Sequence, residues 1–134
     1  MKKTTIEKVV RIAACSDTDI ANAIIKLAEP LMAACSNDIE LKTIIFSLAV
    51  EGWNLSLFRE SDESYLNKIQ QKIPTVISDE NKIIFTGFVL QIIKKKQEDF
   101  GGMKKGITDY TIQFDDDGNP IVTVKTLPVN PKQT

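Results

Sequence analysis

The two cysteines, Cys15 and Cys35, occur in nearly identical octets, AACSDTDI at 13–20 and AACSNDIE at 33–40. Paired thiols can bind a metal ion or cycle between dithiol and disulfide. Two cysteines, however, cannot complete a zinc site without carboxylates or a second subunit, and their spacing lacks the Cys-x-x-Cys of zinc-binding motifs. A free cysteine preceded by two alanines is typical of a small buried residue. We therefore predict structural, reduced thiols, with no metal and no cofactor.

The sequence contains no histidine. This absence excludes Ser-His-Asp and Cys-His nucleophilic catalysis, the His-Glu-x-x-His zinc proteases and the usual general base near neutral pH. Glycine-rich phosphate loops of the Gly-x-Gly-x-x-Gly or Walker type are also absent. The composition therefore favours a non-catalytic protein.

The acidic run DDDG at 115–118 suggests a calcium loop. When the glycine of the EF-hand template is aligned with Gly118, Gln113 falls at its first position and Val124 at its last, where the template requires Asp and Glu. Because both ends fail, the run predicts an acidic hairpin turn instead.

A group of lysines brackets the Gly101–Gly102 pair: Lys94, Lys95, Lys96, Lys104 and Lys105. Such a cluster could contact phosphates, which dominate non-specific affinity for nucleic acids. Lysine without arginine reads bases poorly, and Phe100 is the only aromatic residue in the segment available for stacking. The pattern favours a solvated helix end, and nucleic-acid binding is the second interpretation of the sequence.

A polar stripe crosses the most apolar segment of the chain at Thr43, Ser47, Glu51 and Asn54. If Glu51 were buried beside Asn54, the carboxyl group would have the surroundings of an acid–base site. The same stripe suits an exposed helix face or the wall of a cleft. A carboxylate-dependent enzyme is therefore the third interpretation.

The overall composition is that of an ordinary globular protein. The 134 residues are 43% hydrophobic and 26% charged, with a formal net charge of −1. This length predicts a single domain over 1–134. The first residues are too charged for a signal peptide, and the apolar stretch at 43–50 is too short to span a bilayer. We therefore expect a cytoplasmic location without membrane contact.

Apolar periodicity predicts helices on both sides of the first octet. The first helix carries a stripe from Ile6 to Ala14, preceded by a capping box of Thr4 and Glu7. The second extends from about Ile20 to Leu31, and Pro30 should kink or split it. Each octet is interpreted as a helix end followed by the cap of the next helix, with Ser36 or Asn37 as the cap in the second octet.

Three further helices follow. The third, about 38–58, is apolar on more than one face and is predicted to be central, with Trp53 in the core. The fourth begins near Ser61 and ends before Pro74, and the fifth covers about 79–99, with lysines in its last turns. The helical part thus extends over about 4–100.

The period changes to two after Gly102, which predicts two strands joined by the acidic turn, a hairpin over about 107–127. Its apolar face comprises Tyr110, Ile112, Phe114, Val122 and Val124. A lone hairpin is marginal in water, so this face must pack on the helices or meet another chain. The residues 128–134 are expected to form a frayed tail.

The sequence therefore predicts an α+β protein, a five-helix bundle-like core followed by a C-terminal antiparallel β-hairpin. For its function we expect a protein-interaction module, such as an adaptor, immunity-type or inhibitory protein. Two strands alone have unpaired edges that attract another chain. The expected partner is a protein or a second copy, with the hairpin as the dimer contact.

Overall fold

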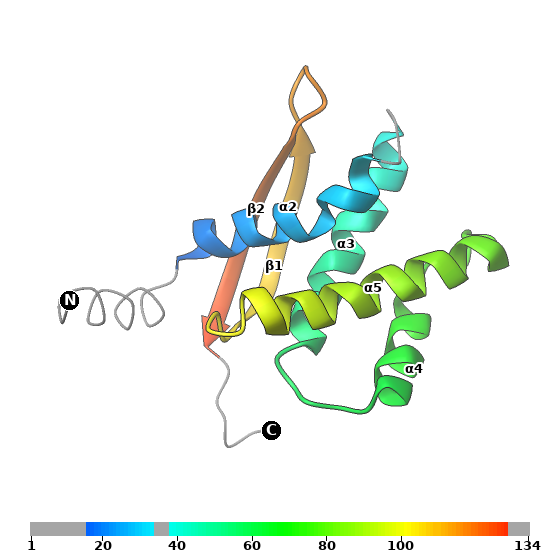
Figure 1. The fold of residues 1–134 in the computed structure, drawn as a ribbon. Helices are drawn as coiled ribbons and strands as arrows, with labels where there is room; N and C mark the ends of the chain where they lie inside the picture. Colours follow the sequence, from blue (N-terminus) through cyan, green and yellow to red (C-terminus); the bar gives the residue numbers. More distant parts are fainter. Residues whose placement is uncertain (1–15, 34–37, 129–134) are drawn as a thin grey trace, which may run out of the picture.

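The computed structural model describes residues 16–33 and 38–128, which form helices followed by a two-stranded antiparallel sheet (Figure 1). The elements are α2 (Asp17–Ala33), α3 (Ile39–Leu55), α4 (Asp62–Lys72), α5 (Asp79–Asp99), β1 (Lys105–Phe114) and β2 (Pro120–Pro128). The predicted α+β class is confirmed. The described residues contain four helices, not five, because the first predicted helix lies outside them, as do Cys15, Cys35 and residues 129–134.

Short polar side chains start the helices. Ser16 and Asp19 bond each other's backbone amides at 3.1 and 3.0 Å, a reciprocal capping arrangement at the start of α2. Ser61 and Ser78 accept amide hydrogen bonds at the starts of α4 and α5. The cap of α3 differs from the prediction. Asp38, rather than Ser36 or Asn37, accepts from the Leu41 amide at 3.1 Å.

The structure excludes a split at Pro30 and places the end of α3 earlier than predicted. Pro30 does not split α2, which continues through it to Ala33. The proline lies in the last turn, so little helix remains beyond it to be disturbed. Likewise, α3 ends at Leu55 rather than at Phe58, and the Ser56 amide closes its last turn on the Gly52 carbonyl.

The core is built around α3, which contacts α2, α4, α5 and β1. Trp53 is fully buried, which confirms its predicted place in the core. The close approach of α5 depends on Gly52. A Cβ atom there would lie 2.8 Å from Cγ2 of Ile92, so any larger residue would push the two helices apart.

The hairpin lies on one side of the helices (Figure 1). Helix α2 crosses it, α3 lies beside β1, and the turn between the strands stands clear of the helices. Among the described elements, β2 contacts only β1 and α2. In the part of the chain that the structure describes, no helix has both the length and the apolar character needed to cross a membrane.

Candidate interaction surface at the hairpin

The turn of the hairpin is organised by Asp115. Its side chain accepts hydrogen bonds from the amides of Asp117, at 3.0 Å, and Asn119, at 2.8 Å. Gly118 has a φ of 81°, a conformation that suits glycine at this position of a three-residue hairpin loop. The Asp115 carboxylate is thus occupied by the backbone of its own loop. The acidic run forms the predicted hairpin turn.

An irregularity in β1 changes which side chains face the helices. The register passes from Ile107 opposite Thr126 to Asp109 opposite Lys125, so Thr108 is an extra residue, a β-bulge. Without the bulge, Ile107 and Tyr110 would point to opposite faces of the sheet. With it, both face the helices, and Ile107 is 7% exposed. Strict alternation in the sequence did not predict this.

The five residues of the predicted apolar face all point toward the chain's own helices. Val124 is buried, and Tyr110, Ile112, Phe114 and Val122 are partly buried against the core. The Tyr110 hydroxyl donates to Ser47 Oγ at 3.0 Å, and the Phe114 ring meets the Phe46 ring edge-on. These side chains are therefore occupied within the chain. Only the edges of the sheet remain for contact with another molecule.

The beginning of β1 is attached to the end of α3. Asn54 donates from Nδ2 to the Ile107 carbonyl at 3.0 Å, and its Oδ1 accepts from the Ile107 amide at 2.8 Å. The side-chain amide thus pairs with β1 as a neighbouring strand would. Trp53 Nε1 also donates to the Lys105 carbonyl at 2.9 Å. These contacts close the first half of the outer edge of β1.

The register shows which backbone groups point outward. The Asp115 amide donates to the Asn119 carbonyl at 2.9 Å, so these residues form a hydrogen-bonded pair. Because hydrogen-bonded and non-hydrogen-bonded pairs alternate in an antiparallel ladder, the next non-hydrogen-bonded pairs follow directly. They are Phe114–Pro120, Ile112–Val122 and Tyr110–Val124. Ile107 turns both backbone groups to Asn54, so Ile107–Thr126 belongs to the same class.

The second half of the β1 edge is partly occupied. The outward amide of Tyr110 donates to Asp109 Oδ1 at 2.9 Å. The outward groups of Ile112 and Phe114 have no hydrogen-bond partner among the described residues, but α3 lies alongside this part of the strand. Lys42 of that helix places its Nζ 6.0 Å from the centroid of the Phe114 ring. A new strand at this edge would therefore meet α3.

Within residues 16–33 and 38–128, nothing is bonded to the outer edge of β2. Its outward backbone groups belong to Val122, Val124 and Thr126, and none of them bonds another described residue. Pro120 and Pro128 stand at the two ends of this stretch, where the missing N–H prevents the ladder from continuing. On the solvent face, Ile121 is 50% exposed and Leu127 is 62% exposed. This surface, the backbone of 122–126 with Ile121 and Leu127, is called the β2 edge below.

The lysines that could contact phosphates differ in their exposure and in their partners. Lys96 is only 2% exposed; its Nζ donates to the Met103 carbonyl at 2.9 Å and lies 4.9 Å from the Trp53 ring centroid. Burial therefore removes Lys96 from any phosphate contact. Lys94 pairs with Asp62 at 3.3 Å, and Lys95 pairs with Asp99 at 3.5 Å. Lys104 is exposed and Lys105 is half-buried at the start of β1.

The polar stripe of α3 lines a groove but does not form an acid–base pair. Thr43, Ser47 and Glu51 face a groove of about 260 Å³ that Lys72 and Tyr110 also line. Glu51 is half-buried and makes no hydrogen bond or ion pair with the described residues, and Asn54 is engaged with β1 instead. No set of three or more possible metal-binding side chains occurs within 16–33 and 38–128.

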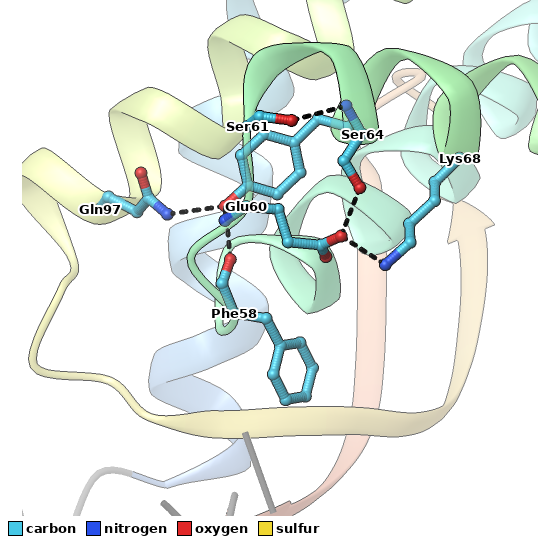
Figure 2. Close-up of polar contacts among 7 residues, drawn as sticks. Phe58, Glu60, Ser61, Ser64, Lys68 and Gln97 are labelled. Atoms are coloured by element: carbon cyan, nitrogen blue, oxygen red, sulfur yellow. Dashed lines mark hydrogen bonds and ion pairs between the residues drawn. The ribbon is translucent and has the colours of Figure 1, made fainter.

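A second polar cluster holds the segment between α3 and α4 (Figure 2). Glu60, Ser64 and Lys68 point toward one another, with Glu60 Oε1 2.6 Å from both Ser64 Oγ and Lys68 Nζ. Hydrogen bonds from Lys68 and Ser64 hold the pKa of Glu60 below its usual value. The buried Tyr65 hydroxyl donates to the Phe58 carbonyl. Each of these polar groups has a hydrogen-bond partner within the cluster, so we assign the cluster a structural role.

The comparisons with known proteins give no relative from which a function could be transferred. No family model, no curated protein and no solved structure matches the chain. Three features of this surface had no clear signal in the sequence: the Asn54 contact, the bulge at Thr108 and the difference between the two edges. The only hint of the Asn54 contact was a polar residue in the last turn of an apolar helix.

Proposed function

We propose that this protein is a non-catalytic protein-interaction module, of adaptor, immunity or inhibitor type, that binds a partner strand along the β2 edge. The observation that carries the proposal is the difference between the strands. The first half of β1 is bonded to Trp53 and Asn54, whereas the outward groups of β2 have no partner among the described residues. Added strands gain main-chain hydrogen bonds from such an edge.

The other two interpretations have less support. Nucleic-acid binding needs several cations on one surface, but Lys96 is buried and Lys94 and Lys95 lie in ion pairs with carboxylates. A carboxylate-dependent enzyme needs a second group to act with Glu51, and no described residue bonds it. Neither the lysines nor the groove at Glu51 therefore supports a second candidate function.

The test blocks the β2 edge without changing the hairpin itself. In Val122→Pro the lost N–H is one that points outward, so the bonds between β1 and β2 stay intact. Val122→Ala is the matched control, because it trims the same side chain and keeps the N–H. Wild type, Val122→Pro and Val122→Ala would each be used as bait for a displayed library of extended peptides, and their self-association would be measured by sedimentation.

We expect wild type and Val122→Ala to bind the same strands, in peptides or in further copies, and Val122→Pro to lose at least about tenfold in affinity. Amide exchange at Val122, Val124 and Thr126 should slow when the partner is bound. If neither peptides nor further copies bind, or if binding is equal in Val122→Pro and Val122→Ala, the proposal is wrong.

A further inference from the structure

The β2 edge is symmetric about Val124. Pro120 and Pro128 lie four residues before and after it, and the two exposed apolar residues of the strand, Ile121 and Leu127, lie three residues before and after it. A strand that meets a second copy of itself in antiparallel fashion around a two-fold axis pairs residues at equal distances from its centre. The strand therefore has a natural centre for self-pairing.

The outward backbone groups fit this arrangement. With Val124 at the axis, Val124 faces Val124 of the second copy, and Val122 faces Thr126. These residues have outward N–H and C=O groups, so each opposing pair can exchange two hydrogen bonds, as antiparallel strands require. At both ends Pro120 faces Pro128 of the other copy, and the ladder stops where no N–H exists to extend it.

The side chains of the solvent face fit the same register. Ile121 of one copy lies opposite Leu127 of the other, so the two apolar residues left exposed on β2 cover each other. Thr123 lies opposite Lys125, which avoids a contact between like charges. A shift of the axis to residue 125 would place the two Lys125 side chains opposite each other, and a shift to 123 would oppose Ile121 with Lys125.

We propose that two copies of this chain pair through β2 in antiparallel fashion, with Val124 at the two-fold axis, to form a four-stranded sheet β1-β2-β2-β1. This dimer rests on the proposed function, and it identifies the partner strand as β2 of a second copy. Both copies then place their helices on the same face of the sheet. Because α3 lies alongside each outer β1 strand, the assembly closes as a dimer and does not grow into a fibre.

Charge substitutions on the solvent face test the register. In Ile121→Lys/Leu127→Lys, lysines oppose each other twice across the axis, whereas in Ile121→Glu/Leu127→Lys each lysine opposes a glutamate. Both variants replace the same two exposed residues, so each is the control for the other. By sedimentation of the full chain, we expect the Lys/Lys variant to dissociate about tenfold more readily than wild type and the Glu/Lys variant to remain a dimer.

Cross-linking tests the same register without relying on charge. In a background with Cys15 and Cys35 replaced by serine, a Thr123→Cys chain mixed with a Lys125→Cys chain should form a disulfide between the two chains. Directly opposed, non-hydrogen-bonded residues lie close enough for that bond. Thr123→Cys alone should not cross-link, because its own symmetry mate lies two positions away.

The outcomes separate this proposal from the proposed function. A wild-type chain that stays monomeric at millimolar concentration overturns the dimer, and so does equal association of the two charge variants. Self-linking of Thr123→Cys overturns the register. If, in those cases, extended peptides still bind wild type and not Val122→Pro, the interaction module survives with a different partner. If the chain stays monomeric and no peptide binds either, both proposals fail.

Discussion

The two outer edges of the hairpin are treated differently by the rest of the molecule. The β1 edge is bonded to α3 through Trp53 and Asn54, and its next amide is taken by Asp109. The β2 edge makes no such bond with the described residues and is limited only by prolines at its two ends. Both strands bury side chains of the same sheet face against the helices, so burial alone does not distinguish the two edges.

Unpaired edges promote unwanted association, and natural sheets usually protect both. Here one edge is closed by a helix and the other is only shortened. The open stretch between Pro120 and Pro128 is long enough to pair with one strand, and the two prolines limit how far the ladder can run along β2. A surface of this kind suits a defined partner better than indiscriminate aggregation.

The largest effect is expected from Trp53→Ala, which removes a fully buried core side chain that also bonds the closed edge. We expect a loss of about 3–5 kcal/mol in the free energy of unfolding, because a fully buried indole leaves a large cavity. Urea unfolding measures this loss. Trp53→Phe should lose less, because an aromatic ring still fills most of the space. Its remaining loss reflects the missing bond to the Lys105 carbonyl. Equal stability of Trp53→Ala and wild type would contradict the buried position.

Asn54→Ala should open the closed edge. It leaves the amide and the carbonyl of Ile107 without partners, at a cost of about 1–3 kcal/mol in the free energy of unfolding. Amide exchange at Ile107 should quicken while exchange in the core of α5 changes little. In Asn54→Asp the carboxylate still accepts from the amide but cannot donate to the carbonyl, so intermediate stability is expected. An unchanged exchange rate at Ile107 in Asn54→Ala would show that the edge is closed by other means.

Val122→Pro should have little effect on the isolated chain. Its missing N–H belongs to the open edge, so the free energy of unfolding of the monomer should change by less than about 1 kcal/mol, measured under conditions where no partner binds. Thr123→Pro is the counterpart, because its N–H points toward β1; the lost ladder hydrogen bond should cost about 1–3 kcal/mol. A larger loss in Val122→Pro than in Thr123→Pro would mean that the outward and inward positions have been assigned the wrong way round.

The smallest effect is expected at Glu60, which lies outside both edges. Because the pKa of Glu60 is lowered in the folded chain, its contribution to stability is present above the unfolded-state pKa and is lost as the pH falls through the folded value. Glu60→Gln should therefore be slightly less stable than wild type near pH 7, and the difference should shrink and vanish in acid as the pH falls through the lowered pKa of Glu60. Thermal unfolding across that range is the measurement. A difference that persists in acid would point to packing rather than charge.

Much of the fold could be predicted from local patterns. The boundaries of α4 and α5 agree with their serine caps and with Pro74, and the acidic run forms the turn that its residues favour. The errors lie where several local signals compete, as at the cap of α3, or where a helix ends without a strong stop signal, as at Leu55. Helix ends of this kind are the least certain feature of any periodic pattern.

Less of the candidate surface could be predicted. The five apolar residues of the hairpin were found by their alternation, but their covering by α2 and α3 depends on how the hairpin is placed. Lys96 appeared in the sequence as one of several equivalent lysines. Its burial depends on Trp53, which is far away along the chain, and on the Met103 carbonyl, which accepts its charged group.

The sequence by itself determined the local features of this protein: the helix starts, the turn at 115–118, the alternation in both strands and the symmetry of β2 about Val124. The tertiary structure alone decided that Thr108 forms a bulge, that Asn54 closes one edge and that the other stays open. The physical reason is the range of the interactions. Caps and turns are made by residues a few positions apart, whereas an edge is closed only when a distant helix brings a donor and an acceptor to it.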